Sequence, residues 1–444
     1  MRYNTMYAAV AKELGEYLYS SATAQAIDLW GRMYRGQAPW NNHKTRSAGI
    51  ASAISSEIAR LITIEARGEV SGSDVLNVEL QNILSKLRRY TEYGAAKGGL
   101  IIKPIVYNDT ITTQFIQADR FFPLAYDSSG ELIKCVFADQ LRKGNTIFTL
   151  LEVHTLEGGV YTVENRLYRS NYDGVLGTRI ALSEVDKWAD LDDEGKFTGI
   201  DRLPFGLFTC PMANHIDEDS PMGVSVFSRA VELISEADRR YSGESWEFES
   251  KEAAVHIGAS MLQYDKEQDR YIYPGGRNML YRALETSTGA VDQKLLDVYS
   301  PDIRYDAYKE GWNEQLRRIE FACNLAYGTI SDPNNVDRTA TEIEASKQRS
   351  YTFICDCQKS LEHALNGWID GAAFWLALNG QSGAYELTIE WGDGILANPD
   401  AEREEDRKDL ANGTLRPEEY RAKYRNETID EAVKNLPRTA EVMT

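Results

Sequence analysis

The sequence lacks the signatures of several common classes of protein. No run of about 18 apolar residues occurs in the 444-residue chain, which excludes a membrane-spanning helix. The opening residues do not have the charged-then-apolar pattern of a secretory signal, so none is expected. Neither a Gly-x-Gly-x-x-Gly turn nor a Gly-x-x-x-x-Gly-Lys-Ser/Thr loop is present. The chain therefore has no recognisable nucleotide-binding motif.

Cysteine and histidine are both scarce, with five residues of each. Only Cys355 and Cys357 lie close together, and no second pair is present to complete a zinc site. We expect reduced structural thiols in an intracellular compartment. The histidines never fall at the spacing of metal ligands, and structural or surface roles are expected for them. We therefore expect no metal and no cofactor.

No sequence pattern marks a catalytic centre. A Gly-x-Ser-x-Gly nucleophile elbow is absent. A Ser/His/Asp triad stays open, since triads assemble in space rather than along the chain. A carboxylate pair of the glycosidase type is equally possible and equally unmarked. We expect a protein that is not an enzyme, with no catalytic residues.

Acidic residues outnumber basic ones by 68 to 49, which gives a formal net charge of −19. Binding to nucleic acid through phosphate contacts needs Lys and Arg, so such a surface does not seek DNA. An acidic protein can still handle DNA by confining or repelling it. With 43% hydrophobic and 26% charged residues, the composition is that of a soluble globular protein. The length allows two or three domains.

Hydrophobic periodicity predicts an α+β protein. Apolar residues recur at helical intervals over 48–64 and 76–87, and residues 1 to about 90 are expected to be mainly helical. Short β-branched and aromatic segments between 100 and 167, separated by turn signals, predict a mostly antiparallel sheet. Residues 184–202 carry many acids and two glycines and are expected to form an exposed acidic loop.

The second half is expected to be dominated by long helices. One begins near Gly223 and continues for about 30 residues, with an interruption at Gly243. A mixed segment separates it from a second helix, over 302–327. The longest helix is predicted from Thr341 to about Leu378, followed by a strand over 385–391 and a charged, helix-rich tail.

The second of these helices carries a row of four carboxylates at four-residue intervals, which places them along one side. Like charges at this spacing cost an isolated helix roughly 0.2–0.5 kcal/mol per pair. Two interpretations remain open. The row is either a solvated charged face or the wall of a passage that keeps a polyanion from binding. The four residues are Asp302, Asp306, Glu310 and Glu314.

A polar, turn-forming segment precedes the longest helix. Pro333 and the Asn334–Asn335 pair favour turn geometry. Thr339 and Thr341 are each followed three residues later by a glutamate, which gives two overlapping capping-box patterns. The sequence therefore predicts an exposed loop held between two helices.

Taken in order, several segments resemble the portal proteins of tailed bacteriophages. Each is short, and their order and spacing along nearly the whole chain carry the resemblance. The segments are Leu29–Gly36 with Pro39-Trp40, Ser55–Glu65, Leu150–His154, Glu164–Tyr168, Asp219–Phe227 and Arg338–Glu344.

The resemblance implies a division of the chain into the parts of a portal subunit. N-terminal helices and a mostly antiparallel sheet would form the wing, and two long stem helices would flank a small α/β clip. A helical crown would end the chain. The implied segments are wing 1–222, first stem helix 223–255, clip 256–300, second stem helix 301–328, tunnel loop 329–340, long wing/crown helix 341–380 and crown 381–444.

The resemblance also implies a function. Portal proteins form rings, usually of twelve subunits, at one capsid vertex of the virion, assembled in the host cytoplasm. Double-stranded DNA is packaged and later ejected through the channel without sequence specificity, driven in by a separate terminase. Partners would include head-completion or adaptor proteins and the major capsid and scaffolding proteins. The alternatives are another oligomeric virion connector and an acidic carbohydrate-active enzyme.

On this resemblance, two groups of residues would face DNA. The carboxylate row would line the channel, where it would discourage DNA from adhering. The tunnel loop would touch the DNA backbone, although Arg338 would equally well pair with an acid on the long helix. The loop residues concerned are Asp332, Asn334, Asn335, Val336, Asp337 and Arg338.

Overall fold

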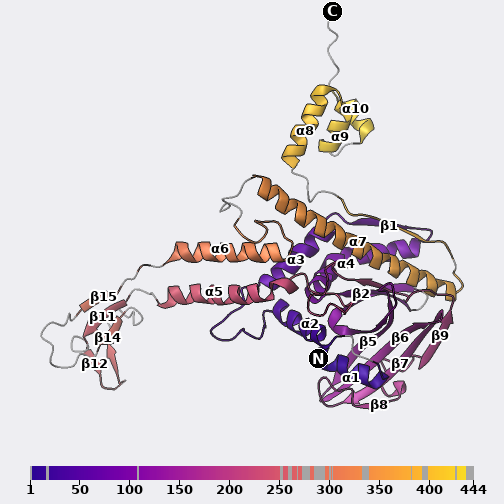
Figure 1. Cartoon of the computed structure of the whole chain (residues 1–444), viewed down its shortest axis with the longest axis horizontal. Helices are drawn as coiled ribbons and strands as arrows, with labels where there is room; N and C mark the ends of the chain where they lie inside the picture. The colour runs from indigo at the N-terminus through magenta and orange to yellow at the C-terminus, as the bar shows by residue number, and fades with distance from the viewer. Residues whose placement is uncertain are drawn as a thin grey trace, which may run out of the picture. The chain divides into compact units, whose positions relative to one another are not determined.

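The computed structural model describes most of the chain, and every structural statement below concerns the residues it describes. These are 3–16, 20–107, 110–250, 254–258, 263–267, 269–272, 281–284, 296–299, 302, 304–332, 340–381, 383–392, 399–425 and 428–436. The chain divides into two compact units, Met1–Glu390 and Trp391–Thr444. The first unit contains all of the sheets and the long helices (Figure 1).

Two of the expected helices have nearly the predicted bounds, whereas α5 begins at Val231 rather than near Gly223 and α6 covers Tyr305–Ala322 rather than 302–327. Helix α3 covers most of the expected 48–64 segment, and the longest helix has nearly the predicted bounds. The helices are α1 Tyr3–Leu14, α2 Ser21–Tyr34, α3 Ile50–Thr63, α4 Asp74–Lys97, α5 Val231–Ser250, α6 Tyr305–Ala322 and α7 Ala340–Leu378.

The main sheet is antiparallel and has the strand order β4-β5-β6-β7-β8, with β9 paired to β7 as well. A smaller antiparallel sheet has the order β10-β2-β3. The α+β class and the mostly antiparallel sheet predicted from sequence are confirmed. The strands are β2 Leu100–Tyr107, β3 Thr110–Gln117, β4 Phe121–Tyr126, β5 Leu132–Lys143, β6 Thr146–Glu157, β7 Val160–Ser170, β8 Thr178–Ile180, β9 Glu194–Thr198 and β10 Gly206–Phe208.

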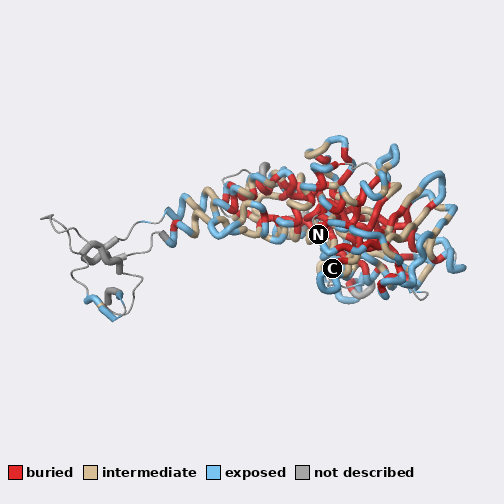
Figure 2. The backbone as a smooth tube through the Cα atoms, turned by 90° about the horizontal axis from the view of Figure 1, so that it is seen from below, coloured by how far each residue is buried: buried red, intermediate tan, exposed pale blue. Residues whose placement is uncertain are grey.

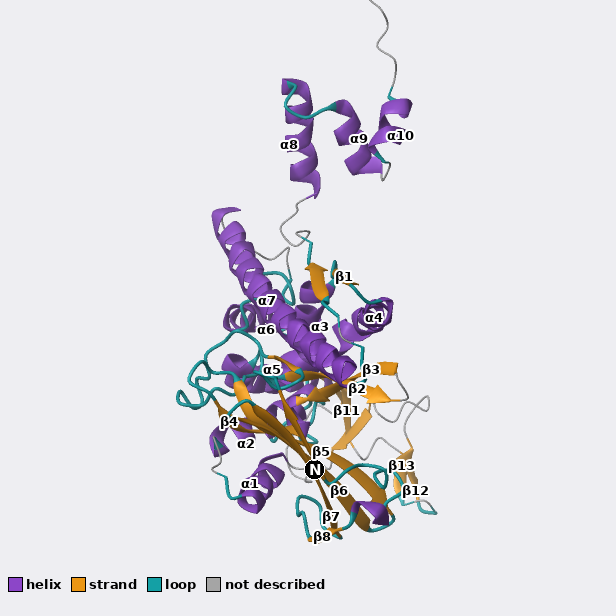
Figure 3. Ribbon diagram, turned by 90° about the vertical axis from the view of Figure 1, so that its right-hand side faces the viewer, coloured by secondary structure: helices purple, strands orange, loops and turns teal. Residues whose placement is uncertain are grey.

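Helix α7 lies against the smaller sheet, along β2 and β10 (Figure 3). Its Trp368 is fully buried. Buried residues are concentrated where the sheets, α3, α4 and α7 pack together, whereas the ends of α5 and α6 nearest residues 250 and 305 are largely exposed (Figure 2). The core thus lies beneath α7 rather than along the α5–α6 pair.

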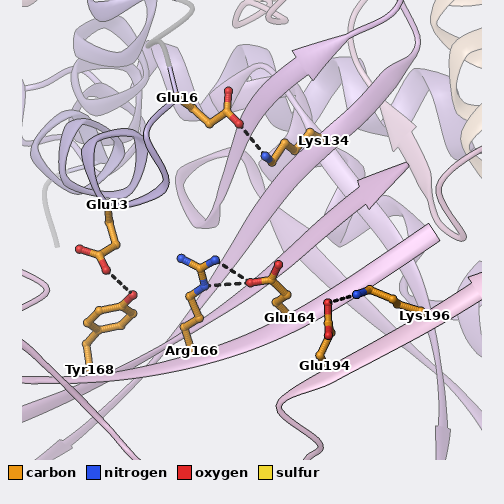
Figure 4. A network of polar contacts seen from close by, with 8 residues as sticks. All are labelled: Glu13, Glu16, Lys134, Glu164, Arg166, Tyr168, Glu194 and Lys196. Atoms are coloured by element: carbon orange, nitrogen blue, oxygen red, sulfur yellow. Dashed lines mark hydrogen bonds and ion pairs between the residues drawn. The ribbon is translucent and has the colours of Figure 1, made fainter. Parts of the chain in front are cut away.

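Helix α1 and the residues just after it are tied to strands β5 and β7 of the main sheet by polar contacts (Figure 4). The hydroxyl of Tyr168 on β7 donates to Glu13 at 2.9 Å, and Lys134 on β5 pairs with Glu16 at 2.6 Å. The Glu13 carboxylate makes the Tyr168 hydroxyl harder to ionise. Burial and the adjacent Glu13 carboxylate together raise the pKa of Tyr168 to about 12.

Residues 184–202 are mostly exposed, as their composition indicates, but they are not simply a loop. Val185 and Trp188 are buried in an apolar cluster with Leu150 and Leu167. Strand β9 then pairs with β7, and its Phe197 stacks on Tyr161 at a centroid distance of 5.8 Å. The predicted exposure is confirmed, whereas the predicted loop is partly wrong because three well-spaced apolar side chains anchor an otherwise acidic segment.

One further local prediction was wrong, and one strand was not foreseen. Gly243 does not interrupt a helix, since α5 runs through it to Ser250. A glycine costs a helix only about 1 kcal/mol, which packing of α5 on α6 outweighs. The segment after α3 forms strand β1, Arg67–Ser71, which pairs antiparallel with β16, Glu386–Glu390. No local pattern reveals that pairing, because the two strands are far apart in sequence.

A buried polar cluster joins the two sheets. Lys103 on β2 forms an ion pair with Glu152 on β6. Nδ1 of His154 lies 2.7 Å from the hydroxyl of Tyr161 on β7, and its Nε2 lies 3.2 Å from Glu152. His154 is almost fully buried among aromatic rings. The structural role predicted for this histidine fits its position.

This cluster predicts acid sensitivity. Burial, reinforced by Lys103, lowers the pKa of His154, and Glu152 opposes the shift only partly. The folded chain therefore holds this histidine neutral, while the unfolded chain takes up a proton near pH 6.5. Stability is present above that pH and falls by up to about 1.4 kcal/mol per pH unit below it. Urea unfolding between pH 7.5 and 5 measures the slope. His154→Gln should make the free energy of unfolding depend less on pH in this range. An unchanged slope would show that His154 does not cause the acid sensitivity.

Candidate functional site

Helices α5 and α6 pack side by side and antiparallel (Figure 1). Near one end, Gln315 donates to the carbonyl of Leu233 at 2.9 Å. Near the other, Arg304 makes a two-pronged contact with the buried Glu247, at 3.1 and 2.8 Å. Because α5 residues of rising number meet α6 residues of falling number, the two helices run in opposite directions.

The segment that connects these helices is described as strands. Strand β11, Ala254–Gly258, pairs parallel with β14, Tyr281–Leu284, and antiparallel with β15, Leu296–Tyr299. Strands β12, Gln263–Asp265, and β13, Arg270–Ile272, form a separate hairpin. A small strand element thus lies between two antiparallel helices in the segment where the sequence predicted a clip.

The four carboxylates of the predicted row are all exposed. Three lie on α6, and Asp302 lies just before it. The middle two, Asp306 and Glu310, lie on the side of α6 away from α5, since the residues that contact α5, such as Gly311 and Gln315, fall on the other side. Glu314 accepts from Arg318 one turn later at 3.3 Å, which relieves part of the like-charge cost.

The end of α6 is joined to the following turn by a buried carboxylate. Glu320 is fully buried and accepts from the backbone N–H groups of Ile330 at 2.7 Å and Ser331 at 2.9 Å. The Ser331 hydroxyl donates to it at 2.9 Å, and the Gly328 N–H at 3.3 Å. One side chain of α6 therefore fixes the course of residues 328–331.

A second set of contacts carries this anchoring to α7. The N–H of Asp332 donates to Asn313 on α6 at 2.7 Å, and that of Tyr327 donates to Ser346 on α7 at 2.8 Å. Arg349 of α7 donates to the carbonyl of Leu325 and lies over the ring of Phe321 at 4.7 Å. We call residues 323–332, held in this way between α6 and α7, the anchored turn.

The anchored turn includes the first residues, 329–332, of the predicted tunnel loop, so those residues are held against α6. Of the predicted DNA-facing residues, Asp332 is described by the structure. The other predicted loop residues, Asn334, Asn335, Val336, Asp337 and Arg338, lie outside the described part of the chain. The structure thus places the start of the loop and, at Ala340, the helix that follows it.

Sequence reasoning missed Glu320 and Asn313. Both are buried polar residues on α6, spaced seven residues apart and therefore on one side of the helix. Their spacing was the available signal, since a polar pair beside an apolar stripe near a helix end indicates groups that satisfy a turn.

Helix α5 holds the loop that carries Pro39-Trp40. Asp238 is almost fully buried and accepts from the Trp40 indole N–H at 2.8 Å, the Ala48 N–H at 2.8 Å and the Asn41 amide at 3.2 Å. The segment quoted for the family resemblance is therefore fixed against the first of the two paired helices.

The second unit consists of short polar helices, α8 Pro399–Asn412, α9 Pro417–Arg425 and α10 Ile429–Asn435. Asp406 accepts from Lys423 and from the Tyr424 hydroxyl, at 2.7 Å each. The predicted crown began at residue 381, whereas β16 belongs to the first unit and the second begins at Trp391.

Within the described residues, no His, Cys, Asp and Glu side chains gather in threes or more in a way that would hold a metal ion. No helix of the described part is both long and apolar enough to span a membrane.

No family model and no curated protein matches the chain. Among solved structures, the chain is similar to one described as "Neck of native GTA particle computed with C12 symmetry". That match has a TM-score of 0.38 and 12% sequence identity, and covers 93% of this chain and 94% of the other.

Proposed function

We propose that the chain is a structural subunit of a virion connector of the portal type. Copies would form a closed ring, usually of twelve, around a channel for double-stranded DNA. The observation that supports this best is the order of elements from α5 onward. Along the chain, two antiparallel helices flank a small strand element, and an anchored turn and a polar stretch of sequence then precede the 39-residue helix α7.

The charge of the chain supports the same proposal. A conduit works best when DNA does not adhere, because each Lys or Arg contact with phosphate adds affinity. A net charge of −19 and an exposed carboxylate row suit such a role. The chain would supply no catalysis, and a separate terminase would provide the energy of packaging. Head-completion and capsid proteins would be the other partners, at one capsid vertex.

The mass of the purified protein in solution tests the proposal. Twelve copies of the 50.1 kDa chain would give a particle of ~600 kDa. Light scattering followed by negative-stain imaging should show that mass and rings with a central hole. A compact monomer or dimer with a hydrolytic activity would instead support the enzyme alternative. If the protein forms rings but DNA packaging does not depend on it, a virion connector other than a portal would be supported.

The loop is tested separately. Deleting Asn334 to Val336 should leave the ring intact and stop the passage of DNA in a packaging assay, since the anchored turn before the loop and α7 after it keep their contacts. Removing a segment of equal length from the exposed turn 127–130 is the control. Normal packaging by the loop deletion would reject a role for this loop in the channel.

A further inference from the structure

The side of α5 that faces away from α6 carries a basic cavity. Its volume is about 610 Å³, and three basic residues, Lys44, Arg46 and Arg239, line it together with Trp246 and one carboxylate, Glu249. Arg239 and Trp246 are seven residues apart on one side of α5, opposite the residues that contact α6. In a chain with so large an excess of acids, this concentration of basic side chains indicates an acidic partner.

The cavity is built rather than formed by chance contact of loose side chains. The backbone N–H of Arg46 donates to Ser242 at 2.8 Å, next to the Asp238 contacts that hold the same loop. Across the described part of the chain, no ion pair involves Lys44, Arg46 or Arg239, and all three are exposed. Trp246 is 66% exposed. Three positive charges against the single negative charge of Glu249, and an indole ring, are thus available to a partner.

A complementary surface lies on the opposite side of the same helix pair. Because four residues overshoot a helical turn by about 40°, the carboxylate row winds around α6. Its middle members, Asp306 and Glu310, are the two that lie directly away from α5. Both are exposed and neither takes part in an ion pair with another described residue. The pair therefore has a basic face on α5 and an acidic face on α6.

The basic face and the acidic face also lie at similar positions along the axis of the α5–α6 pair, which we call their height. Arg240 donates to the carbonyl of Gly311, which sets its neighbour Arg239 level with Glu310. The contact of Arg304 with Glu247 sets Trp246 nearly level with Asp306. Rotation about a ring axis moves a copy sideways without changing its height. With the helix pair along that axis, the acidic face of one copy meets the basic face of the next.

We propose that the basic cavity on α5 receives Asp306 and Glu310 of a second copy of this chain, in a head-to-tail contact that closes the ring. The proposal rests on the proposed function, since it assumes a ring. It assigns the middle of the carboxylate row to the subunit interface instead of the channel wall. A second copy fits better than DNA because the same chain carries the matching acidic face at the matching height.

Charge reversal on each face tests the contact. Lys44→Glu with Arg239→Glu reverses the basic face, and Asp306→Lys with Glu310→Lys reverses the acidic one. Each double variant alone should fall from ring mass to the 50.1 kDa monomer, because its interface then joins like charges. An equimolar mixture should regain ring mass, since native faces meet at alternate interfaces and doubly reversed faces meet at the others.

Matched controls change the net charge equally at exposed positions elsewhere. Lys86→Glu with Arg88→Glu on α4, and Asp190→Lys with Asp192→Lys, should leave the mass unchanged. Circular dichroism of each variant checks the fold. Rings that persist in both reversed variants would overturn this inference and leave the proposed function standing. A wild-type chain that never assembles would overturn both. Unchanged rings with weakened binding of duplex DNA by the α5 variant would make the cavity a phosphate site instead.

Discussion

Replacing Glu320 with alanine is expected to lower the free energy of unfolding by about 3 kcal/mol, since each buried group left unpaired costs about 1–3 kcal/mol. The carboxylate accepts from the backbone of Ile330 and Ser331 and from the Ser331 hydroxyl, in a place that excludes water. Alanine would leave these donors without an acceptor. Equilibrium unfolding in urea measures the loss, and hydrogen exchange at Ile330 and Ser331 should rise in the same variant.

Glu320→Gln is the matched variant. Its amide oxygen retains one acceptor at nearly the same volume, so the loss should be roughly half that of alanine. Glu314→Ala on the exposed side of α6 should change stability by less than about 0.5 kcal/mol. Equal stability of Glu320→Ala and the native chain would show that the anchored turn does not depend on this carboxylate.

The same substitution connects stability with the proposed role of the loop. The anchored turn fixes where the chain leaves α6, and Ser346 and Arg349 fix where it meets α7. When the anchored turn loses its contacts with Glu320, the residues between it and α7 gain conformational freedom. Ordering these residues again costs conformational entropy. On the proposed function, DNA passage should therefore weaken in Glu320→Ala even under conditions in which the ring still assembles.

Sequence periodicity predicted the elements that depend on local patterns. Helix α7 was expected from Thr341 and is observed from Ala340, because capping-box patterns mark its start and its apolar residues recur at helical intervals from Tyr351 to Trp375. The exposed carboxylate row on α6 was likewise readable, since helix geometry alone places residues four apart on one side. The short strands between 100 and 167 followed from alternation and turn signals.

The features that were missed depend on contacts between distant segments. The pairing of β1 with β16 joins residues more than 300 positions apart, and neither strand has a pattern that identifies the other. Trp188 is buried because it packs in a cluster with Leu150 of β6 and Leu167 of β7. Glu320 and Asn313 became meaningful once the turn that they hold was in place. Tertiary contacts, rather than propensity, decided each of these cases.

Gly206→Ala is expected to destabilise the first unit by about 3 kcal/mol or more, which is at the upper end of the cost of overpacking. A β-carbon at this position would lie 1.7 Å from the backbone carbonyl oxygen of Ala364 on α7. A β-carbon at Gly367 of α7 would lie 2.8 Å from the Cα of Gly206, and one at Gly371 would lie 2.2 Å from the carbonyl oxygen of Pro204. The long helix therefore rests directly on the backbone of β10, and no flexible side chain is available to yield.

Gly31→Ala in helix α2 is the matched control. Like Gly206, Gly31 is buried in the first unit. A β-carbon added there would lie at ordinary contact distance, 3.5 Å or more, from its nearest neighbours. Alanine favours a helix over glycine by about 1 kcal/mol, so stability should hold or rise. Thermal unfolding of both variants decides the matter. If Gly206→Ala unfolded at the native temperature, α7 would not rest on β10 this closely, and the position of the helix that follows the loop would need another explanation.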